Sequence, residues 1–110
     1  MISYDDFEKV DIRAGRIVEV KEFPRARNPS YKLEIDFGDP IGRKWSSAAA
    51  ARDYSMEELK GMYVIAVVNF PPKNIAGFMS EVLTLGVPAE DGGLSLLMPS
   101  HPPQLGGRLY

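Results

Sequence analysis

Polar and hydrophobic residues alternate along much of the chain, which predicts strands rather than long helices. The clearest alternation covers residues 31–37, where four large side chains fall on one face: Tyr31, Leu33, Ile35 and Phe37. A further short strand is predicted over residues 43–48. Residues 63–68 form another predicted strand that is hydrophobic on both faces, so protein must cover both of its sides.

The first predicted strand, residues 11–21, is long and breaks its own alternation. Gly15 predicts a bend or bulge, Arg16 interrupts the hydrophobic face, and Ile17 interrupts the polar one. An unpaired buried guanidinium is costly, so we expect Arg16 to emerge at the mouth of a barrel or to pair with an acid. The residues predicted to face the core are Ile12, Ala14, Val18 and Val20.

Two short helical segments are predicted from their N-terminal caps. Ser3 with Asp6 three residues later resembles a capping box and predicts a helix over residues 4–9. Ser55 with Glu58 forms a second box within residues 48–61, and Gly61 ends that segment. One helical turn has little stability alone, so each must dock on the rest of the protein or on a partner.

Residues 69–85 predict a hairpin with a long, stiff loop. Pro71 and Pro72 end the preceding strand because neither carries a backbone N–H. Gly77 marks a position of positive φ or close backbone approach, and residues 80–85 form the returning strand. The loop carries four large hydrophobic residues, which must brace it or contact a ligand: Phe70, Ile75, Phe78 and Met79.

The order of elements fits a small Greek-key barrel of the OB type, an all-β fold with short helices. We expect one domain, with the N-terminal helix at about 4–9, the barrel at about 11–86 and a C-terminal extension at about 87–110. A further short strand is predicted over 94–98. OB folds bind ligands on one sheet face and in the first and fourth connecting loops, here residues 23–30 and 70–78.

Two features near these loops each have two interpretations. Arg25 and Arg27, with Lys32 just beyond, form the densest basic cluster, which is either a solvated loop or a phosphate site. Trp45, the only tryptophan, is either a core residue or a ligand platform.

Composition argues against catalysis and metal binding. The 110 residues include no cysteine and a single histidine, His101, which lies in a proline-rich segment. No nucleophile motif, glycine-rich phosphate loop or metal-ligand spacing is present, so we expect no enzyme activity, no metal and no cofactor. The net charge of −2 does not by itself indicate a nucleic-acid-binding domain. No segment has the length of a membrane span or a signal core, and we expect a cytoplasmic protein without membrane insertion.

Several motifs resemble the tRNA-binding domain family of OB-fold modules, which occur alone or appended to aminoacyl-tRNA synthetases. They are DFEKVDIRAG near the start, EIDFG, the SSA after Trp45, and VVNFPP followed by IAGF and SEVL. Within that family the sequence is most similar to the stand-alone CsaA branch of homodimeric, export-related chaperones. The resemblance implies a ligand surface around an N-x-x-P loop and the following S-[EQ] pair: Asn69, Pro72, Lys73, Ser80 and Glu81.

Two functions remain open at this point. Lys73 is the only cation in the 70–81 loop, which weakens the phosphate contribution to tRNA binding. The hydrophobic residues of the loop favour unfolded or export-bound polypeptides as partners, with the export machinery as a further contact. A structure-specific tRNA-binding protein is the alternative, since bases could stack on Phe70, Phe78 or Trp45. In a third interpretation the loop only braces the barrel or builds a dimer.

A homodimer is also predicted. The uncovered N-terminal helix and the hydrophobic C-terminus point to it, together with the resemblance. The expected interface residues are Phe7, Ile17, Leu109 and Tyr110.

Overall fold

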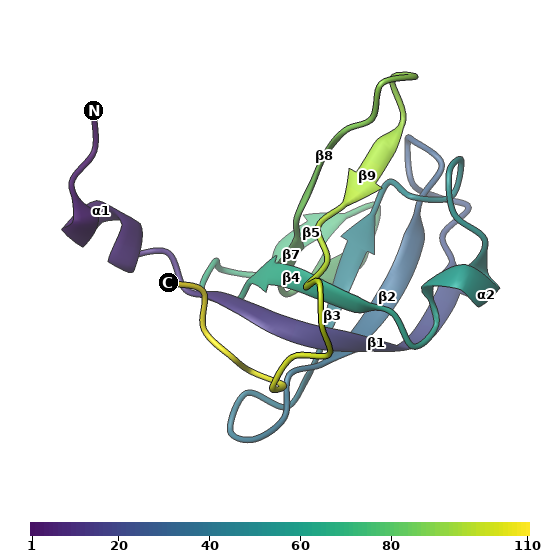
Figure 1. Cartoon of the computed structure of the whole chain (residues 1–110). Helices are drawn as coiled ribbons and strands as arrows, with labels where there is room; N and C mark the ends of the chain where they lie inside the picture. The colour runs from purple at the N-terminus through teal and green to yellow at the C-terminus, as the bar shows by residue number, and fades with distance from the viewer.

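The computed structural model describes all residues, 1–110, and shows a five-stranded antiparallel sheet curled into a nearly closed barrel, as an OB fold requires (Figure 1). The strand order in this sheet is β3-β2-β1-β4-β7. Its strands are β1 (Ile12–Glu22), β2 (Tyr31–Asp36), β3 (Arg43–Ala48), β4 (Tyr63–Val67) and β7 (Leu83–Thr84). The predicted fold class is confirmed.

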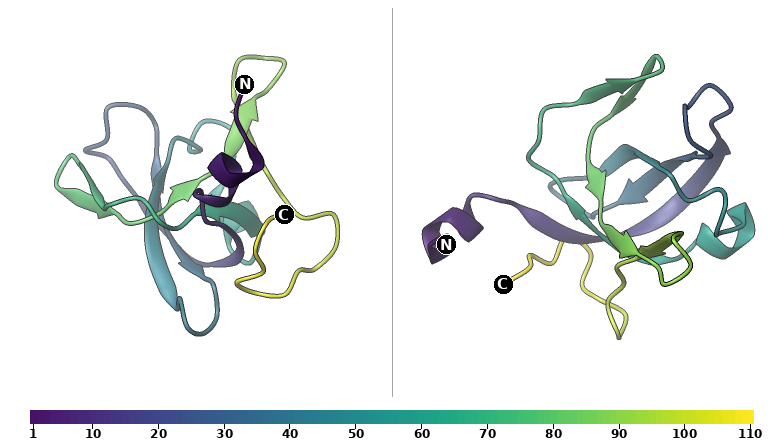
Figure 2. Two further views of the ribbon diagram at one scale, coloured as in Figure 1. Left: turned by 90° about the vertical axis from the view of Figure 1, so that its left-hand side faces the viewer. Right: turned by 90° about the horizontal axis from the view of Figure 1, so that it is seen from above.

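Two short helices and two small hairpins surround the barrel (Figures 1 and 2). Ser3 and Ser55 both form complete capping boxes, so the two predicted helix starts are confirmed. Helix α1 projects from the body of the molecule beside the C-terminus, and none of its residues is buried. The remaining elements are α1 (Tyr4–Glu8), α2 (Met56–Leu59), β5 (Lys73–Ile75), β6 (Phe78–Ser80), β8 (Gly86–Pro88) and β9 (Leu94–Leu96).

The barrel core is built from the alternation that the sequence displays. Leu33, Ile35 and Phe37 are fully buried along and just beyond β2, as predicted. Gly15 on β1 faces them, and a Cβ there would lie only 2.6 Å from Cγ2 of Ile35. Gly15 therefore admits the neighbouring core side chains, rather than marking the irregularity itself.

The prediction for β1 is wrong in its central part. The register against β2 shifts between Ile17 and Glu19, so one extra residue is inserted and the faces exchange. Ile17 is completely buried, opposite Ile35, and cannot be a dimer contact. Val18, predicted to be inward, is half-buried at the bulge. Arg16 is exposed and donates from Nε to the carbonyl of Gly61, in agreement with its expected emergence at the barrel edge.

The predicted returning strand, residues 80–85, is divided in two. Ser80 ends β6 and β7 begins at Leu83, because Glu81 and Val82 turn toward β3 and their N–H groups donate to the carbonyl of Trp45. Leu83 then pairs with Val67 of β4. This crossing segment closes the barrel between β3 and β4.

The C-terminal segment continues the sheet beside the first half of β1. Gly106 donates to the carbonyl of Ala14, and Leu109 donates to the carbonyl of Ile12. β2 covers only the second half of β1, so the tail occupies the remaining edge. No helix in the structure is both long enough and hydrophobic enough to cross a bilayer.

Candidate ligand-binding surface

The fourth connecting loop contains an additional inner hairpin, β5–β6, within the loop of the hairpin that the sequence predicts. Ile75 pairs with Phe78 across a two-residue turn of Ala76 and Gly77. Both turn residues have positive φ, 49° and 87°, as in a type I′ turn, and the expected positive φ of Gly77 is confirmed. Asn74 Oδ1 accepts a hydrogen bond from the Gly77 N–H at 2.9 Å and supports the tip.

Two residues of the S-[EQ] motif fasten this hairpin to the free edge of β3. Ser80 Oγ accepts from the N–H of Ser47 at 3.0 Å, and Glu81 Oε1 accepts from the N–H of Trp45 at 2.9 Å. These side chains satisfy strand-edge donors that would otherwise lack a partner. Ser80 and Glu81 therefore have a structural role, although both also border a pocket on this side of the hairpin.

That pocket, the apolar groove, has a volume of about 350 Å³. Phe70 is 53% exposed and Leu83 is 49% exposed, and both side chains border this one hollow. Ile75 from β5 is half-buried beside them. Of the predicted residues, Met79 is exposed outside the groove lining, and Pro71 takes the place expected of Pro72. The lining residues are Ser47, Phe70, Pro71, Lys73, Ile75, Ser80, Glu81, Val82 and Leu83.

On the other side of the hairpin lies an aromatic cluster of Phe23, Trp45 and Phe78. The Phe78 ring makes edge contacts with Phe23 at 5.4 Å and with Trp45 at 6.1 Å between centroids. Phe23 is buried, whereas Trp45 and Phe78 are half-buried. Trp45 is therefore not part of the barrel core but lies on the outer face, as the platform interpretation requires.

Two lysines lie over this aromatic cluster. Lys32 Nζ is 5.0 Å from the Phe23 centroid and 5.1 Å from that of Phe78. Lys21 Nζ is 5.3 Å from the Trp45 centroid. Lys21 and Lys32 are direct cross-strand neighbours on the outer face. Lys32 was part of the predicted basic cluster, whereas Lys21 was not singled out. Its outward position on β1, next to the inward Val20, was the signal in the sequence that could have identified it.

The two predicted arginines of the first loop are separated by the fold. Arg25 lies beside the hairpin tip, in a hollow of about 240 Å³ that Lys32 and Phe78 also line. Arg27 instead borders a different hollow, formed by the first loop and residues near Tyr31. No carboxylate lies within 4 Å of the cations on the hairpin side: Lys21, Arg25, Lys32 and Lys73.

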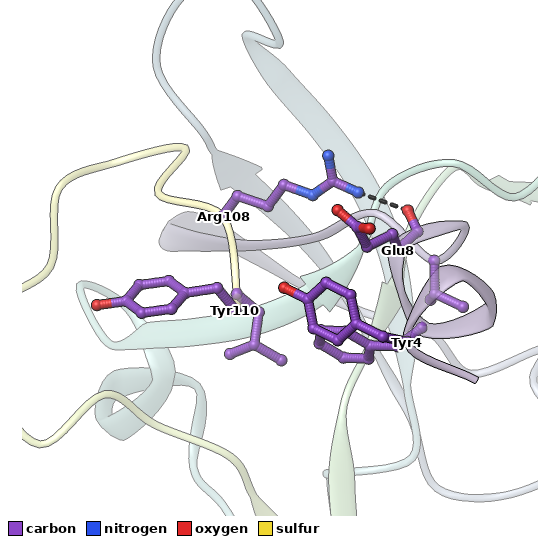
Figure 3. A pocket seen from close by; sticks show the side chains of 7 residues that line it. Tyr4, Glu8, Arg108 and Tyr110 are labelled. Atoms are coloured by element: carbon purple, nitrogen blue, oxygen red, sulfur yellow. Dashed lines mark hydrogen bonds between the residues drawn. The ribbon is translucent and has the colours of Figure 1, made fainter. Parts of the chain in front are cut away.

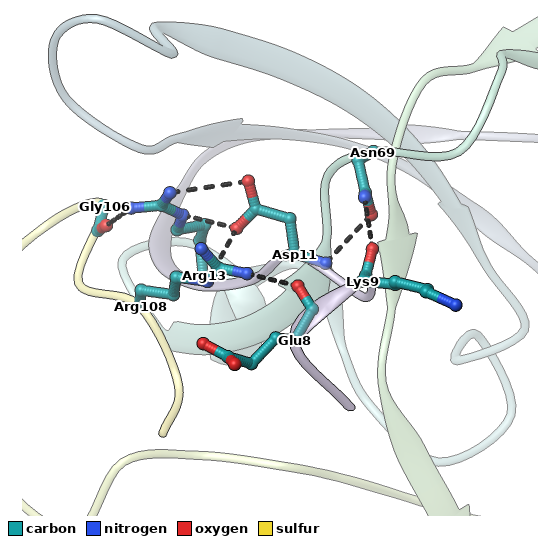
Figure 4. Close-up of polar contacts among 7 residues, drawn as sticks. All are labelled: Glu8, Lys9, Asp11, Arg13, Asn69, Gly106 and Arg108. Carbon is teal, nitrogen blue, oxygen red and sulfur yellow. Dashed lines mark hydrogen bonds and ion pairs between the residues drawn. The ribbon is translucent and has the colours of Figure 1, made fainter. Parts of the chain in front are cut away.

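Asn69, predicted as a ligand contact, has both ends of its amide engaged. Nδ2 donates to the carbonyl of Lys9 at 2.8 Å, and Oδ1 accepts from the N–H of Asp11 at 3.0 Å (Figure 4). The side chain thus connects the start of the fourth loop with the segment between α1 and β1.

A third surface, the terminal surface, lies between α1 and the chain's last residues (Figure 3). Arg108 Nη2 donates to the carbonyl of Glu8 at 2.6 Å and holds the two segments together. Three of the predicted dimer residues, Phe7, Leu109 and Tyr110, line the hollow here; Ile17 does not. Tyr4, also in this lining, is 66% exposed. The hollow measures about 220 Å³.

One carboxyl group near this surface has a shifted pKa. The pKa of Asp6 is lowered because the backbone N–H of Ser3 donates to its carboxylate, and Lys9 lies close by. This shift belongs to the helix cap. No three His, Asp or Glu side chains come together as a metal site would require.

The barrel, its flared hairpin and the grooves beside it define a small OB-fold binding module. Residues 12–108 match the model of the family described as "Putative tRNA binding domain", and the chain belongs to this family.

Solved structures and curated proteins support the same assignment. The CsaA chaperone protein of Picrophilus torridus is 51% identical with a TM-score of 0.93, and all of each chain is covered. The chaperone CsaA of Bacillus anthracis is 44% identical with a TM-score of 0.92, covering 100% of this chain and 99% of that one. The methionine–tRNA ligase of Thermococcus kodakarensis is 37% identical over 109 residues. This match covers 98% of the present chain but only 14% of the ligase.

Proposed function

We propose that this protein is a homodimer that holds non-native or export-bound polypeptides in the apolar groove. The observation that carries the proposal is the exposure of Phe70 and Leu83 around one hollow of about 350 Å³. Side chains of this kind anchor extended polypeptide through their apolar area without requiring a defined sequence. The similarity to two CsaA chaperones supports it, and a cytoplasmic location and contact with the export machinery belong to the same proposal.

The terminal surface supports the homodimer. Tyr4, Leu109 and Tyr110 expose large side chains there, and Ile2 at the start of the chain is 77% exposed. Two copies that paired through this face would cover them. A dimer would also carry two apolar grooves and could hold one long polypeptide twice. Sedimentation at micromolar concentration should then give one species of twice 12.2 kDa; a monomer would contradict this part of the proposal.

The groove itself is tested with Phe70→Ala. Loss of a central aromatic anchor should weaken binding of an unfolded polypeptide by about 2 kcal/mol, or roughly thirty-fold. Met98→Ala is the matched control, because Met98 is 56% exposed but lies outside the groove lining. Reduced, carboxymethylated α-lactalbumin is a suitable probe, and its binding by fluorescence anisotropy should change little with added salt. Equal affinities for the wild type and Phe70→Ala would exclude the groove.

A second candidate function, tRNA binding, is favoured by a different observation. Lys21, Arg25 and Lys32 lie without carboxylate partners beside an aromatic cluster, although the chain as a whole carries a net charge of −2. Cations over aromatic rings are suited to phosphates and stacked bases. In this function Lys32→Gln should reduce the slope of log K against log[salt] by about 0.7 to 0.9.

Lys60→Gln is the control for that measurement, since Lys60 follows α2 and lies outside the grooves. The same pair of titrations separates the two functions. A salt-insensitive affinity that depends on Phe70 supports the polypeptide. A steep salt dependence that depends on Lys32 supports tRNA.

A further inference from the structure

Asn69 is the point at which the terminal surface and the fourth connecting loop are joined. Its amide donates to the carbonyl of Lys9 and accepts from the N–H of Asp11, two backbone groups directly between α1 and β1. The next residue toward β4, Val68, also donates to the carbonyl of Asp11. The strand pairing of β1 and β4 is thereby extended to the beginning of the loop.

Asp11 in turn holds the C-terminal segment. Its carboxylate accepts from Arg13 Nε at 2.6 Å and lies 3.7 Å from Arg108 Nε (Figure 4). Arg13 Nη1 donates to the carbonyl of Gly106, and Arg108 donates to the carbonyl of Glu8. Three segments that are distant in sequence therefore meet at Asp11. These polar bonds help to position α1, of which no residue is fully buried and only Phe7 is half-buried.

On its other side, Asn69 leads directly into the wall of the apolar groove. Phe70 and Pro71 line that groove, and Pro71 has a fixed φ and biases Phe70 toward an extended conformation. With so little backbone freedom after Asn69, the direction in which the chain leaves this residue sets the position of the Phe70 backbone and of Pro71. A rotation at Asn69 would move Phe70 and Pro71 together.

We propose that Asn69 is a positioning residue that couples the terminal surface to the apolar groove, so that dimerisation and polypeptide binding strengthen each other. This rests on the proposed function, because it needs both a dimer and a bound polypeptide. Pairing of two copies fixes α1 and the tail, Asn69 transmits that constraint, and Phe70 is held in the orientation that accepts the ligand. Linkage requires the reciprocal effect, so a bound polypeptide must tighten the dimer by the same factor.

The experiment measures the dimer dissociation constant with and without saturating reduced, carboxymethylated α-lactalbumin. The chain has no cysteine, so Ala49→Cys, at an exposed position outside the apolar groove and the hollow at the terminal surface, gives one labelling site for energy transfer between protomers. We expect the polypeptide to tighten the wild-type dimer by about five-fold or more. In Asn69→Ala the ratio of the two dissociation constants should fall to near one.

Asn74→Ala is the matched control. It removes the same side chain from the same loop, but the bond that it breaks is a local one to Gly77, so the coupling should persist. Asn69→Asp keeps the acceptor for the Asp11 N–H and loses the donor to Lys9, and it should retain part of the coupling. This variant keeps the test decisive even where Asn69→Ala does not fold.

The outcomes separate the inference from the function on which it rests. A wild-type protein that dimerises and binds the polypeptide, with neither affecting the other, overturns the coupling and leaves the proposed function intact. Full coupling in both Asn69 variants overturns the role of Asn69. A wild-type protein that does not dimerise, or does not bind the polypeptide, overturns the proposed function and the coupling together.

Discussion

At the terminal end of the molecule Arg13 and Arg108 both reach the carboxylate of Asp11, whereas at the loop end Lys21, Arg25 and Lys32 have no carboxylate within 4 Å. The arginines of the terminal end also donate to backbone carbonyls, at Gly106 and Glu8. The lysines of the loop end lie instead over aromatic rings, about 5 Å from the ring centroids. Both regions lie on the surface of one small barrel, so the difference is not one of burial alone.

This difference in charge pairing has a physical consequence for each region. Charges that are paired and bonded to backbone carbonyls fix the geometry of the chain around them. Cations that have no acid partner keep their charge available to a ligand, and the rings beneath them supply apolar contact area. The terminal end thus holds the termini and the start of the fourth loop in place, whereas the cations of the loop end are not tied to an acid partner.

The largest effect on stability should come from breaking the paired end. In Asp11→Ala, Arg13 and Arg108 lose their shared acceptor and face each other across an isolated strand bridge. We expect the free energy of unfolding to fall by about 2 kcal/mol, as for hydrogen bonds to a charged group that is mostly covered. Denaturant unfolding measures it. Asp5→Ala is the control, and a loss as small as that of Asp5→Ala would show that the network does not stabilise the tail.

The next prediction compares two phenylalanines of the loop end. Phe78 makes edge contacts with Phe23 and Trp45, so Phe78→Ala should lower the free energy of unfolding by about 1.5 kcal/mol. Phe70 is 53% exposed, so Phe70→Ala should change it by less than about 0.5 kcal/mol. Thermal or denaturant unfolding of both variants measures these two changes in the free energy of unfolding. Equal losses of unfolding free energy in the two variants would mean that Phe70 stabilises the loop and is not free to contact a ligand.

Local signals in the sequence were sufficient for most of the fold. The alternation of Leu33, Ile35 and Phe37 placed these side chains in the core, because a strand's period of two leaves no other arrangement once one face is buried. Ser3 and Ser55 located the two helix starts, since a capping box is complete within four residues. The apolar strand and the prolines that follow it predicted where the fourth connecting loop begins.

The remaining features depend on partners far along the chain. The bulge between Ile17 and Glu19 is fixed by pairing with β2, and it reversed the predicted faces of Ile17 and Val18. Asn69 and Glu81 were expected at the ligand surface; their hydrogen-bond partners, 58 to 60 and 36 residues away, give each of them a structural role that the sequence did not reveal. The approach of Phe23 to Phe78 likewise requires two loops to meet. Residue type could not reveal any of these contacts.

A smaller effect is expected when one cation of the open end is removed. Lys21→Gln relieves repulsion with Lys32 directly across the strands but loses the contact with the Trp45 ring. These two contributions are each about 0.5 kcal/mol and have opposite signs, so the free energy of unfolding should change by less than that amount. If tRNA binds here, the slope of log K against log[salt] should nevertheless fall by about 0.7 to 0.9. An unchanged slope would place the RNA elsewhere, and Lys60→Gln again gives the baseline.

A second small effect is predicted at the tip of the β5–β6 hairpin. Ala76 is the one residue other than glycine with positive φ, at 49°, in a conformation that strains a Cβ. Asn tolerates this conformation, and Asn-Gly is the preferred pair for a two-residue turn in which both φ values are positive. Ala76→Asn should therefore raise the free energy of unfolding by about 0.5 kcal/mol. Ala49→Asn, at an exposed position without positive φ, should give no such gain.

Since Ala76 borders the hollow shared by Arg25 and Phe78, affinities for α-lactalbumin and tRNA should be measured on the same variant. A stabilised hairpin with unchanged affinities would mean that this strain has no role in binding; a stabilised hairpin that binds more weakly would mean that the open end needs a tip that can adjust.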